Sequence, residues 1–146
     1  MFVTAIIAAG GRGLRFGGGQ LKQLATIGGR AVLDWSVSAF VGHPLVAEVL
    51  VALPRQLVDD PPAYLRADAN AAKGVRLVVG GDRRQDSVAN AFHLAATASE
   101  VIVIHDAARP FVSADVIADD RCGGRVGSGG GGAAGARHRE AICRSA

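Results

Sequence analysis

Four short apolar runs alternate with helix-like segments along this chain. The runs cover residues 2–7, 46–53, 75–79 and 101–104, and they are rich in valine, leucine and isoleucine. Continuous apolar runs of this length are typical of strands buried on both faces of a parallel sheet, because helices cover the two sides. The sequence therefore predicts an α/β fold with a doubly wound, mostly parallel sheet and right-handed crossovers.

Helical patterns fill the segments between these runs. The predicted helices cover 31–41, a short segment between Pro62 and Lys73, 88–98 and 114–119. The first is amphipathic and ends before Pro44, since the residue before a proline is pushed out of helical geometry. Ser113 is the expected N-cap of the last helix. Gly28-Gly29 predicts a turn.

A glycine-rich loop follows the first apolar run. Its glycines are Gly10, Gly11, Gly13, Gly17, Gly18 and Gly19, and Arg12, Arg15 and Lys22 lie among them. Glycine lets backbone N–H groups approach a ligand closely, and fixed cations attract a polyphosphate. The alternative is an ordinary surface loop with solvated arginines.

Two common phosphate-binding motifs do not fit this loop. The dinucleotide motif G-x-G-x-x-G, begun at Gly11, needs glycine or alanine where Phe16 stands. A P-loop needs glycine before its lysine and Ser or Thr after it, whereas Lys22 lies between Leu21 and Gln23. The loop therefore belongs to another class of nucleotide site, or to none.

Three polar loops follow predicted strands, at 8–22, 80–87 and 105–110. Ligands of open parallel sheets bind at the carboxyl ends of the strands, so these loops are expected to converge on one crevice. Asp106 is suited to bind Mg²⁺ or to act as a turn residue. Asp82 and Ser87 are suited to contact a base or to cap the next helix, and Arg109 to bind an anion or to pair with Asp106. The histidines are expected to be packed or solvated.

The basic pI of about 9.4 does not indicate nucleic-acid binding once the charges are located. Residues 1–120 carry 11 Lys+Arg against 12 Asp+Glu, whereas residues 121–146 carry 5 against 1. Aromatic residues make up only 5% of the chain, so a nucleic-acid-binding module is disfavoured. No apolar run is long enough to span a membrane, and no basic segment precedes the first run. We expect a cytoplasmic protein without a nucleic-acid or membrane partner.

The last 26 residues differ from the rest. They hold 8 of the 20 glycines and both cysteines, Cys122 and Cys143, and they lack helical or strand periodicity. The two cysteines lack zinc-site spacing. We expect one domain over 1–120 and a disordered Gly/Arg-rich tail over 121–146. Our hypothesis is that this tail is read in a shifted frame, and the alternative is a natural glycine-rich linker.

Three motifs together resemble one family. They are AAGGRGLRFGG with Lys22-Gln23, GGDRRQDSV at 80–88 and VIVIHDAARPFV at 101–112. In this order they resemble the 2-C-methyl-D-erythritol 4-phosphate cytidylyltransferases, over about residues 3–118. The resemblance implies a Rossmann-like nucleotidyltransferase fold of the nucleotide-diphospho-sugar transferase type, incomplete at the C-terminus.

The resemblance also implies a role for each matching residue. Arg15 and Lys22 would be the catalytic residues and stabilise the transition state, Asp106 would bind Mg²⁺, and Arg109 would bind the sugar-alcohol phosphate. The residues implied to bind CTP are Ala8, Ala9, Gly10, Gly11, Gly13, Gly81, Asp82 and Ser87. Members of the family form homodimers, and nothing after residue 120 matches their dimer arm or their later Asp-Thr-x-Lys segment.

Two alternatives stay open. One is a cytidylyltransferase acting on ribitol 5-phosphate, whose members share the fold, although Ala108 favours the methylerythritol enzymes over the ribitol ones. The other is an inactive, truncated nucleotide-binding fragment, which would bind CTP without turning it over.

Overall fold

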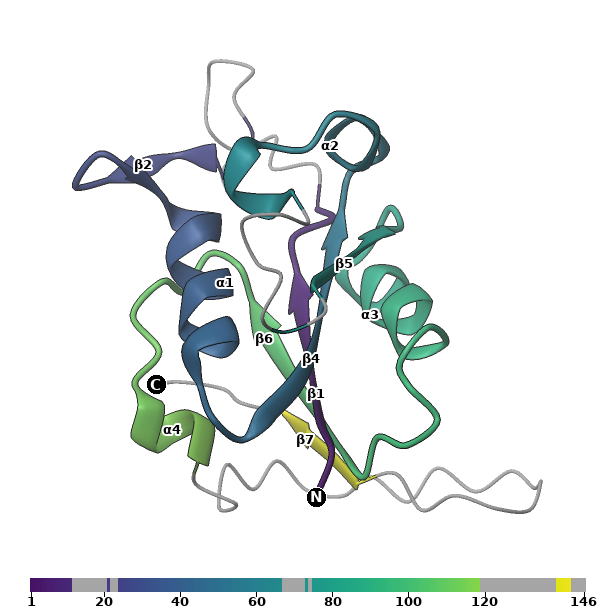
Figure 1. The fold of residues 1–146 in the computed structure, drawn as a ribbon. Helices are drawn as coiled ribbons and strands as arrows, with labels where there is room; N and C mark the ends of the chain where they lie inside the picture. The colour runs from purple at the N-terminus through teal and green to yellow at the C-terminus, as the bar shows by residue number, and fades with distance from the viewer. Residues whose placement is uncertain (12–20, 22–23, 67–72, 74, 119–138, 143–146) are drawn as a thin grey trace.

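The computed structural model describes residues 1–11, 21, 24–66, 73, 75–118 and the backbone of 139–142. Its centre is a five-stranded parallel sheet in the order β5-β4-β1-β6-β7 (Figure 1). The strands are β1 (Val3–Ala8), β4 (Val46–Leu53), β5 (Val75–Val79), β6 (Val101–Asp106) and β7 (Arg139–Ile142). The parallel, doubly wound sheet predicted from the apolar runs is confirmed.

Helices cover both faces of this sheet. Helix α1 (Val32–Gly42) packs on one face and α3 (Arg84–Phe92) on the other (Figure 1). The shorter elements are α2 (Arg55–Asp59), the 3-10 helix η2 (Ala63–Leu65), α4 (Ala114–Ala118) and the hairpin strands β2 (Thr26–Ile27) and β3 (Arg30–Ala31). Of the described helices, none combines the length and the apolar character that crossing a bilayer requires.

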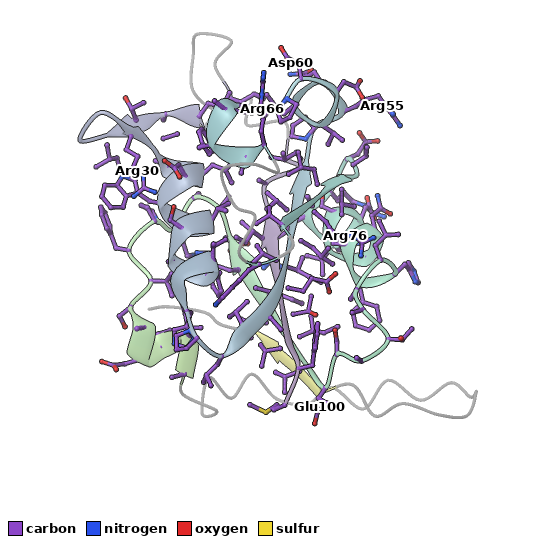
Figure 2. All side chains as sticks on the ribbon, viewed as in Figure 1. Arg30, Arg55, Asp60, Arg66, Arg76 and Glu100 are labelled. Carbon is purple, nitrogen blue, oxygen red and sulfur yellow. The ribbon has the colours of Figure 1, made fainter. Side chains whose placement is uncertain are left out.

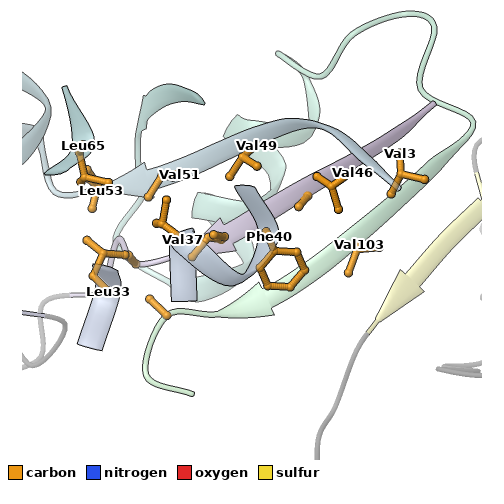
Figure 3. Close-up of a cluster of buried hydrophobic side chains, with 14 residues drawn as sticks. Val3, Leu33, Val37, Phe40, Val46, Val49, Val51, Leu53, Leu65 and Val103 are labelled. Carbon is orange, nitrogen blue, oxygen red and sulfur yellow. The ribbon is translucent and has the colours of Figure 1, made fainter. Parts of the chain in front are cut away.

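The core has two parts, one on each side of the sheet. On the α1 side, Leu33, Val37 and Phe40 are buried against strand residues such as Val49 (Figure 3). On the α3 side, a second cluster contains Ile6, Leu50, Val78, Ala91, Ile102 and Ile104. Burying one such side chain stabilises the fold by about 1.5–3 kcal/mol. Strand β1 contributes to both clusters, which explains its unbroken apolar run.

The order of the strands sets where a ligand can bind. From β1 the chain moves outward through β4 to β5, and α3 then returns it to β6 on the other side of β1. Strands β1 and β6 are parallel neighbours in which Ala8 pairs with Asp106, so their outgoing loops begin side by side at the carboxyl edge of the sheet, where ligands of such sheets bind. Two of the three polar loops predicted to converge begin there.

Three predicted elements have different bounds in the structure. Helix α3 begins at Arg84 rather than 88, because Asp86 accepts the backbone N–H of Arg83 (3.2 Å) and caps an earlier first turn. Strand β6 runs two residues further than expected, because Asp106 still pairs with Ala8 of β1. The helix expected after Pro62 is wrong in the part that the structure describes: α2 comes before that proline, and only the short η2 follows it.

Two local predictions are confirmed. Gly28 and Gly29 form the turn of the β2–β3 hairpin, with φ values of 61° and 77° that other residues adopt only at a cost. The Ser113 hydroxyl accepts the backbone N–H of Val116 (3.3 Å), as expected of an N-cap.

Strand β7 lies inside the segment expected to be a disordered tail, and it pairs in parallel with β6. The expectation that this segment contains no strand is therefore wrong for residues 139–142. The unpaired backbone of an edge strand accepts another extended segment through main-chain hydrogen bonds, which need no side-chain periodicity. The boundary placed at residue 120 lies outside the described residues and stays a prediction.

Candidate active site

Two cavities lie at the carboxyl ends of the strands, and Gly10 lines both of them. The larger has a volume of about 580 Å³ and the smaller about 260 Å³. The larger is lined by Gly10, Leu21, Pro54, Arg55, Gln56, Val79, Gly80, Gly81 and Asp82. The smaller is lined by Ala8, Gly10, Gly11, Arg84, Ser87, Asp106, Ala108 and Arg109. The two cavities therefore adjoin at Gly10.

The loops after β1 and β5 touch through two glycines. A Cβ atom on Gly80 would lie 2.8 Å from the Cα of Gly10 and 2.9 Å from Ser87 Oγ. Non-bonded carbon atoms pack at about 3.5–4.0 Å, so no larger residue fits without moving backbone. A Cβ on Gly10 would likewise collide with the Ser87 hydroxyl. These contacts hold the two loops together and place both cavities around Gly10.

Ser87 has its hydroxyl inside the second loop. The side chain is fully buried, and Oγ accepts the backbone N–H of Gly81 at 3.0 Å. The same oxygen lies 3.3 Å from the carbonyl of Arg83, to which it donates. The alternative that Ser87 is the N-cap of the helix is wrong, because Arg83 occupies that position. Ser87 instead fixes the loop that lines the larger cavity.

The smaller cavity carries one carboxylate between two guanidinium groups. Arg84 Nε lies 2.5 Å from Asp106 Oδ1, and Arg109 Nε lies 3.8 Å from Asp106 Oδ2. All three side chains are partly exposed, at 52%, 46% and 36% for Arg84, Arg109 and Asp106. Asp106 ends β6 and pairs with Ala8 of β1, so it stands beside the loop that follows β1. This cluster places one carboxylate among two cationic side chains at the edge of the cavity.

Buried groups behind Asp106 hold the loop that follows it. The Ser36 hydroxyl on α1 donates to the Ala107 carbonyl at 3.0 Å. The His105 ring packs on Phe40, with 5.0 Å between ring centroids, and its Nε2–H donates to the Arg109 carbonyl at 2.9 Å. Burial lowers the pKa of His105 below its ordinary value, so the ring is neutral at pH 7. The expectation that this histidine is packed is confirmed.

This geometry agrees with the family to which the motifs point. A family model described as 2-C-methyl-D-erythritol 4-phosphate cytidylyltransferase matches residues 3–136. The chain belongs to this family.

Individual proteins similar to this chain have names that belong to the same family. The chain is 47% identical over 116 residues to the bifunctional enzyme IspD/IspF of Dinoroseobacter shibae, covering 80% of this chain and 28% of that one. It is 36% identical over 115 residues to the 2-C-methyl-D-erythritol 4-phosphate cytidylyltransferase of Clostridium botulinum. This match covers 79% of this chain and 50% of that one. The chain thus spans about half the length of the single-function curated relatives it matches.

Solved structures share the fold. The structure of 2-C-methyl-D-erythritol 4-phosphate cytidylyltransferase from Thermus thermophilus matches with a TM-score of 0.59 at 36% identity, over 81% of this chain and 47% of that one. A 4-diphosphocytidyl-2C-methyl-D-erythritol synthase from Anaerococcus prevotii matches with a TM-score of 0.63 at 25% identity. This match covers 80% of this chain and 48% of that one. The Rossmann-like nucleotidyltransferase fold is confirmed.

The structure brings together most of the residues predicted for a cytidylyltransferase site. Those that line the two cavities are Ala8, Gly10, Gly11, Gly81, Asp82, Ser87, Asp106 and Arg109. Ala9 is buried, and its N–H donates to the Ala52 carbonyl. Gly13, Arg15 and Lys22 lie outside the described residues. Sequence reasoning missed Arg84, although it stands in the GGDRRQDSV motif, because nothing local distinguishes it from Arg83.

The donor set of the smaller cavity fits a magnesium ion that is shared with phosphates. Within the described ranges, no group of three or more His, Cys, Asp or Glu side chains is close enough to bind a metal. Mg²⁺ at nucleotide sites takes only one or two carboxylates, and phosphate oxygens and water complete its shell. The single carboxylate of Asp106 suits such an ion.

Replacing Ser36 with alanine should lower the free energy of unfolding by about 1–3 kcal/mol. The change leaves the Ala107 carbonyl without its buried donor, and unmade buried hydrogen bonds cost that much. Urea unfolding followed by circular dichroism measures the effect. Ser113→Ala is a useful comparison, since that hydroxyl is an exposed N-cap. An unchanged midpoint for Ser36→Ala would show that this bond does not hold the loop.

Proposed function

We propose that this chain binds CTP and 2-C-methyl-D-erythritol 4-phosphate and transfers CMP to the latter with release of pyrophosphate. The observation that carries the proposal is the pair of cavities that meet at Gly10 in a member of this family. The larger cavity is lined by glycines, apolar residues and the polar side chains of Arg55, Gln56 and Asp82, and the smaller one includes Arg84, Asp106 and Arg109. Such a pair suits a small base joined to a chain of phosphates.

In this proposal the cytosine ring occupies the larger cavity. Asp82 offers a carboxylate to its polar edge, and Ser87 accepts the Gly81 N–H and so holds the loop in position. The phosphates occupy the smaller cavity, against Ala8, Gly10 and Gly11. Bare backbone amides there take the place of the water that hydrates a free triphosphate. Figure 2 shows Arg55 on α2, close to the end of the molecule where the strands end.

The chemistry requires positioned cations rather than a general base. A phosphate monoester has a second pKa near 6, so it is largely dianionic at pH 7. One of its oxygens attacks the α-phosphorus of CTP, and the bond to the bridging oxygen of pyrophosphate breaks in line. Arg15 and Lys22 neutralise the charge that builds up in the transition state, and Arg109 holds the methylerythritol phosphate. Asp106 is the proposed ligand of Mg²⁺, which when bound would neutralise charge on the phosphates.

Calorimetric titration with CTP, UTP and ATP tests the nucleotide assignment, and pyrophosphate release tests the reaction. We expect CTP to bind at least tenfold more tightly than the others, because a lost hydrogen-bond partner costs about 1–3 kcal/mol. We expect turnover with methylerythritol phosphate and little with ribitol 5-phosphate. Equal affinities for the three nucleotides would contradict the base assignment. CTP binding without any turnover would identify a nucleotide-binding fragment instead.

Family membership supports two further proposals. The first is that the chain self-associates as members of its family do, although nothing in it matches their dimer arm, and sedimentation velocity tests this directly. The proposed substrates are charged, water-soluble metabolites, which supports the cytoplasm as the site of action and argues for neither nucleic acid nor membrane as a partner.

Replacing Asp106 with asparagine should raise the magnesium concentration needed for half-maximal turnover by about tenfold or more. A neutral amide is a poor ligand for a hard cation, while its shape is nearly that of the carboxylate. A magnesium titration of pyrophosphate release measures the change, with CTP affinity in EDTA as a control for folding of the site. An unchanged titration would show that Asp106 is only a turn residue.

A further inference from the structure

Two adjacent arginines at the start of α3 have different partners. Arg83 forms a two-bond pair with Asp86, with Nε–Oδ2 and Nη2–Oδ1 both at 3.0 Å. This hydrogen-bonded pair lowers the pKa of Asp86 below its ordinary value. Arg83 is 70% exposed and does not line either cavity described above. Asp86 therefore neutralises the charge of Arg83, and the two residues together cap the start of the helix.

Arg84 lies over the smaller cavity instead. It lines that cavity together with Gly10 and Gly11, and its Nε donates to Asp106 Oδ1 at 2.5 Å. The contact uses one of the five N–H donors of the guanidinium group, and the side chain is about half exposed. A guanidinium group that lines the cavity is suited to donate further N–H groups to a phosphate there.

The charges of the smaller cavity explain why this pair matters. Its described lining has two guanidinium groups and one carboxylate, Arg84, Arg109 and Asp106. While Asp106 pairs with Arg84, that carboxylate attracts the arginine and repels a phosphate. A divalent cation bound to Asp106 would compete with the arginine for the charge of the same carboxylate. Arg84 would then be released to donate to the phosphates of a bound nucleotide.

We propose that Arg84 is a phosphate-binding residue of the nucleotide site, held ready by Asp106, and that a divalent cation takes over Asp106 when the nucleotide binds. This assignment rests on the proposed function. It makes Arg84 and Mg²⁺ competitors for Asp106 in the free protein and gives both a role in the nucleotide complex. Arg83, one residue away and of equal charge, has neither role.

Calorimetry on the 146-residue chain tests the phosphate contact with matched variants, Arg84→Gln and Arg83→Gln. CTP and cytidine are the two probes, since cytidine has the base and ribose but no phosphate. We expect Arg84→Gln to weaken CTP binding about ten- to hundredfold, the effect of losing charge-assisted hydrogen bonds. We expect cytidine affinity to change less than twofold, and Arg83→Gln to leave both affinities within about twofold of wild type.

Titration with Mg²⁺ alone tests the exchange. Without nucleotide, Arg84→Gln should bind the ion several-fold more tightly than wild type, because Asp106 has lost its competing partner. Arg83→Gln should bind it as wild type does. An unchanged or weaker Mg²⁺ affinity in Arg84→Gln would overturn the competition between the arginine and the ion.

The other outcomes are equally distinct. If Arg84→Gln weakens CTP and cytidine to the same extent, the arginine only shapes the loop, and the phosphate contact is overturned. If both variants weaken CTP equally, the effect is one of overall charge. If wild type binds CTP and Arg84→Gln binds it as well, only this inference fails. If wild type binds neither CTP nor cytidine, the proposed function fails with it.

Discussion

Replacing Lys22 or Arg15 with alanine is expected to lower the rate of CMP transfer by roughly two to three orders of magnitude. In the proposed reaction, negative charge moves from the attacking phosphate to the bridging oxygen of the departing pyrophosphate. A cation placed for that distribution stabilises the transition state more than bound CTP. The loss should therefore appear mainly in kcat, with CTP affinity falling much less.

The measurement is steady-state pyrophosphate release, with CTP affinity from calorimetry on the same preparations. Arg66→Ala is a matched control that removes one exposed cation. Its guanidinium lies 3.6 Å from Asp60 and is 61% exposed, beside α2 and not among the residues that line either cavity (Figure 2). If Lys22→Ala and Arg15→Ala both turn over at near wild-type rates, the catalytic assignment of these residues is wrong.

Replacing Gly80 with alanine should lower the free energy of unfolding by about 1–3 kcal/mol, the usual cost of overpacking a tight contact. The added methyl group would stand 2.8 Å from the Cα of Gly10 and 2.9 Å from Ser87 Oγ. The Gly10 contact is with backbone, which cannot turn away as a side chain can. The loops after β1 and β5 must therefore separate, and CTP affinity should fall with stability because Gly10 lines both cavities.

Urea unfolding and CTP titration together measure these two effects. Gly42→Ala is the control, because it lies at the end of α1 and a Cβ there would meet nothing within 4 Å. It should keep or slightly raise stability, since alanine has the higher helix propensity. Equal stabilities for the Gly80 and Gly42 variants would mean that the two loops do not need their close approach.

The apolar runs alone were sufficient to predict four strands of the parallel sheet and the edge of the sheet at which the two cavities lie. Both follow from short-range patterns: continuous apolar runs predict buried strands, and polar loops follow their carboxyl ends. The position of Asp106 was predicted for the same reason, since it directly follows the run 101–104. Helix boundaries were less accurate. The start of α3 depended on the contact of Asp86 with Arg83, which periodicity does not report.

The family was also identifiable from sequence, because its three motifs are specific in order and in composition. How the loops fit against one another could not be predicted from the sequence. Gly10 needs to be glycine because Gly80 and Ser87, far along the chain, lie against it. This requirement arises only when the order of the strands brings the two loops together.

The difference between Arg83 and Arg84 shows most clearly what only the tertiary structure decided. In the sequence the two are adjacent cations in one motif and cannot be told apart. In the folded chain the turn of α3 directs Arg83 to Asp86 on its own helix and Arg84 to Asp106 on β6. Residue types and local periodicity determined the strands, the loops and the chemistry that they can offer. Long-range packing decided which charged groups pair with each other. That packing alone fixes the distance between two charges, on which their electrostatic interaction depends.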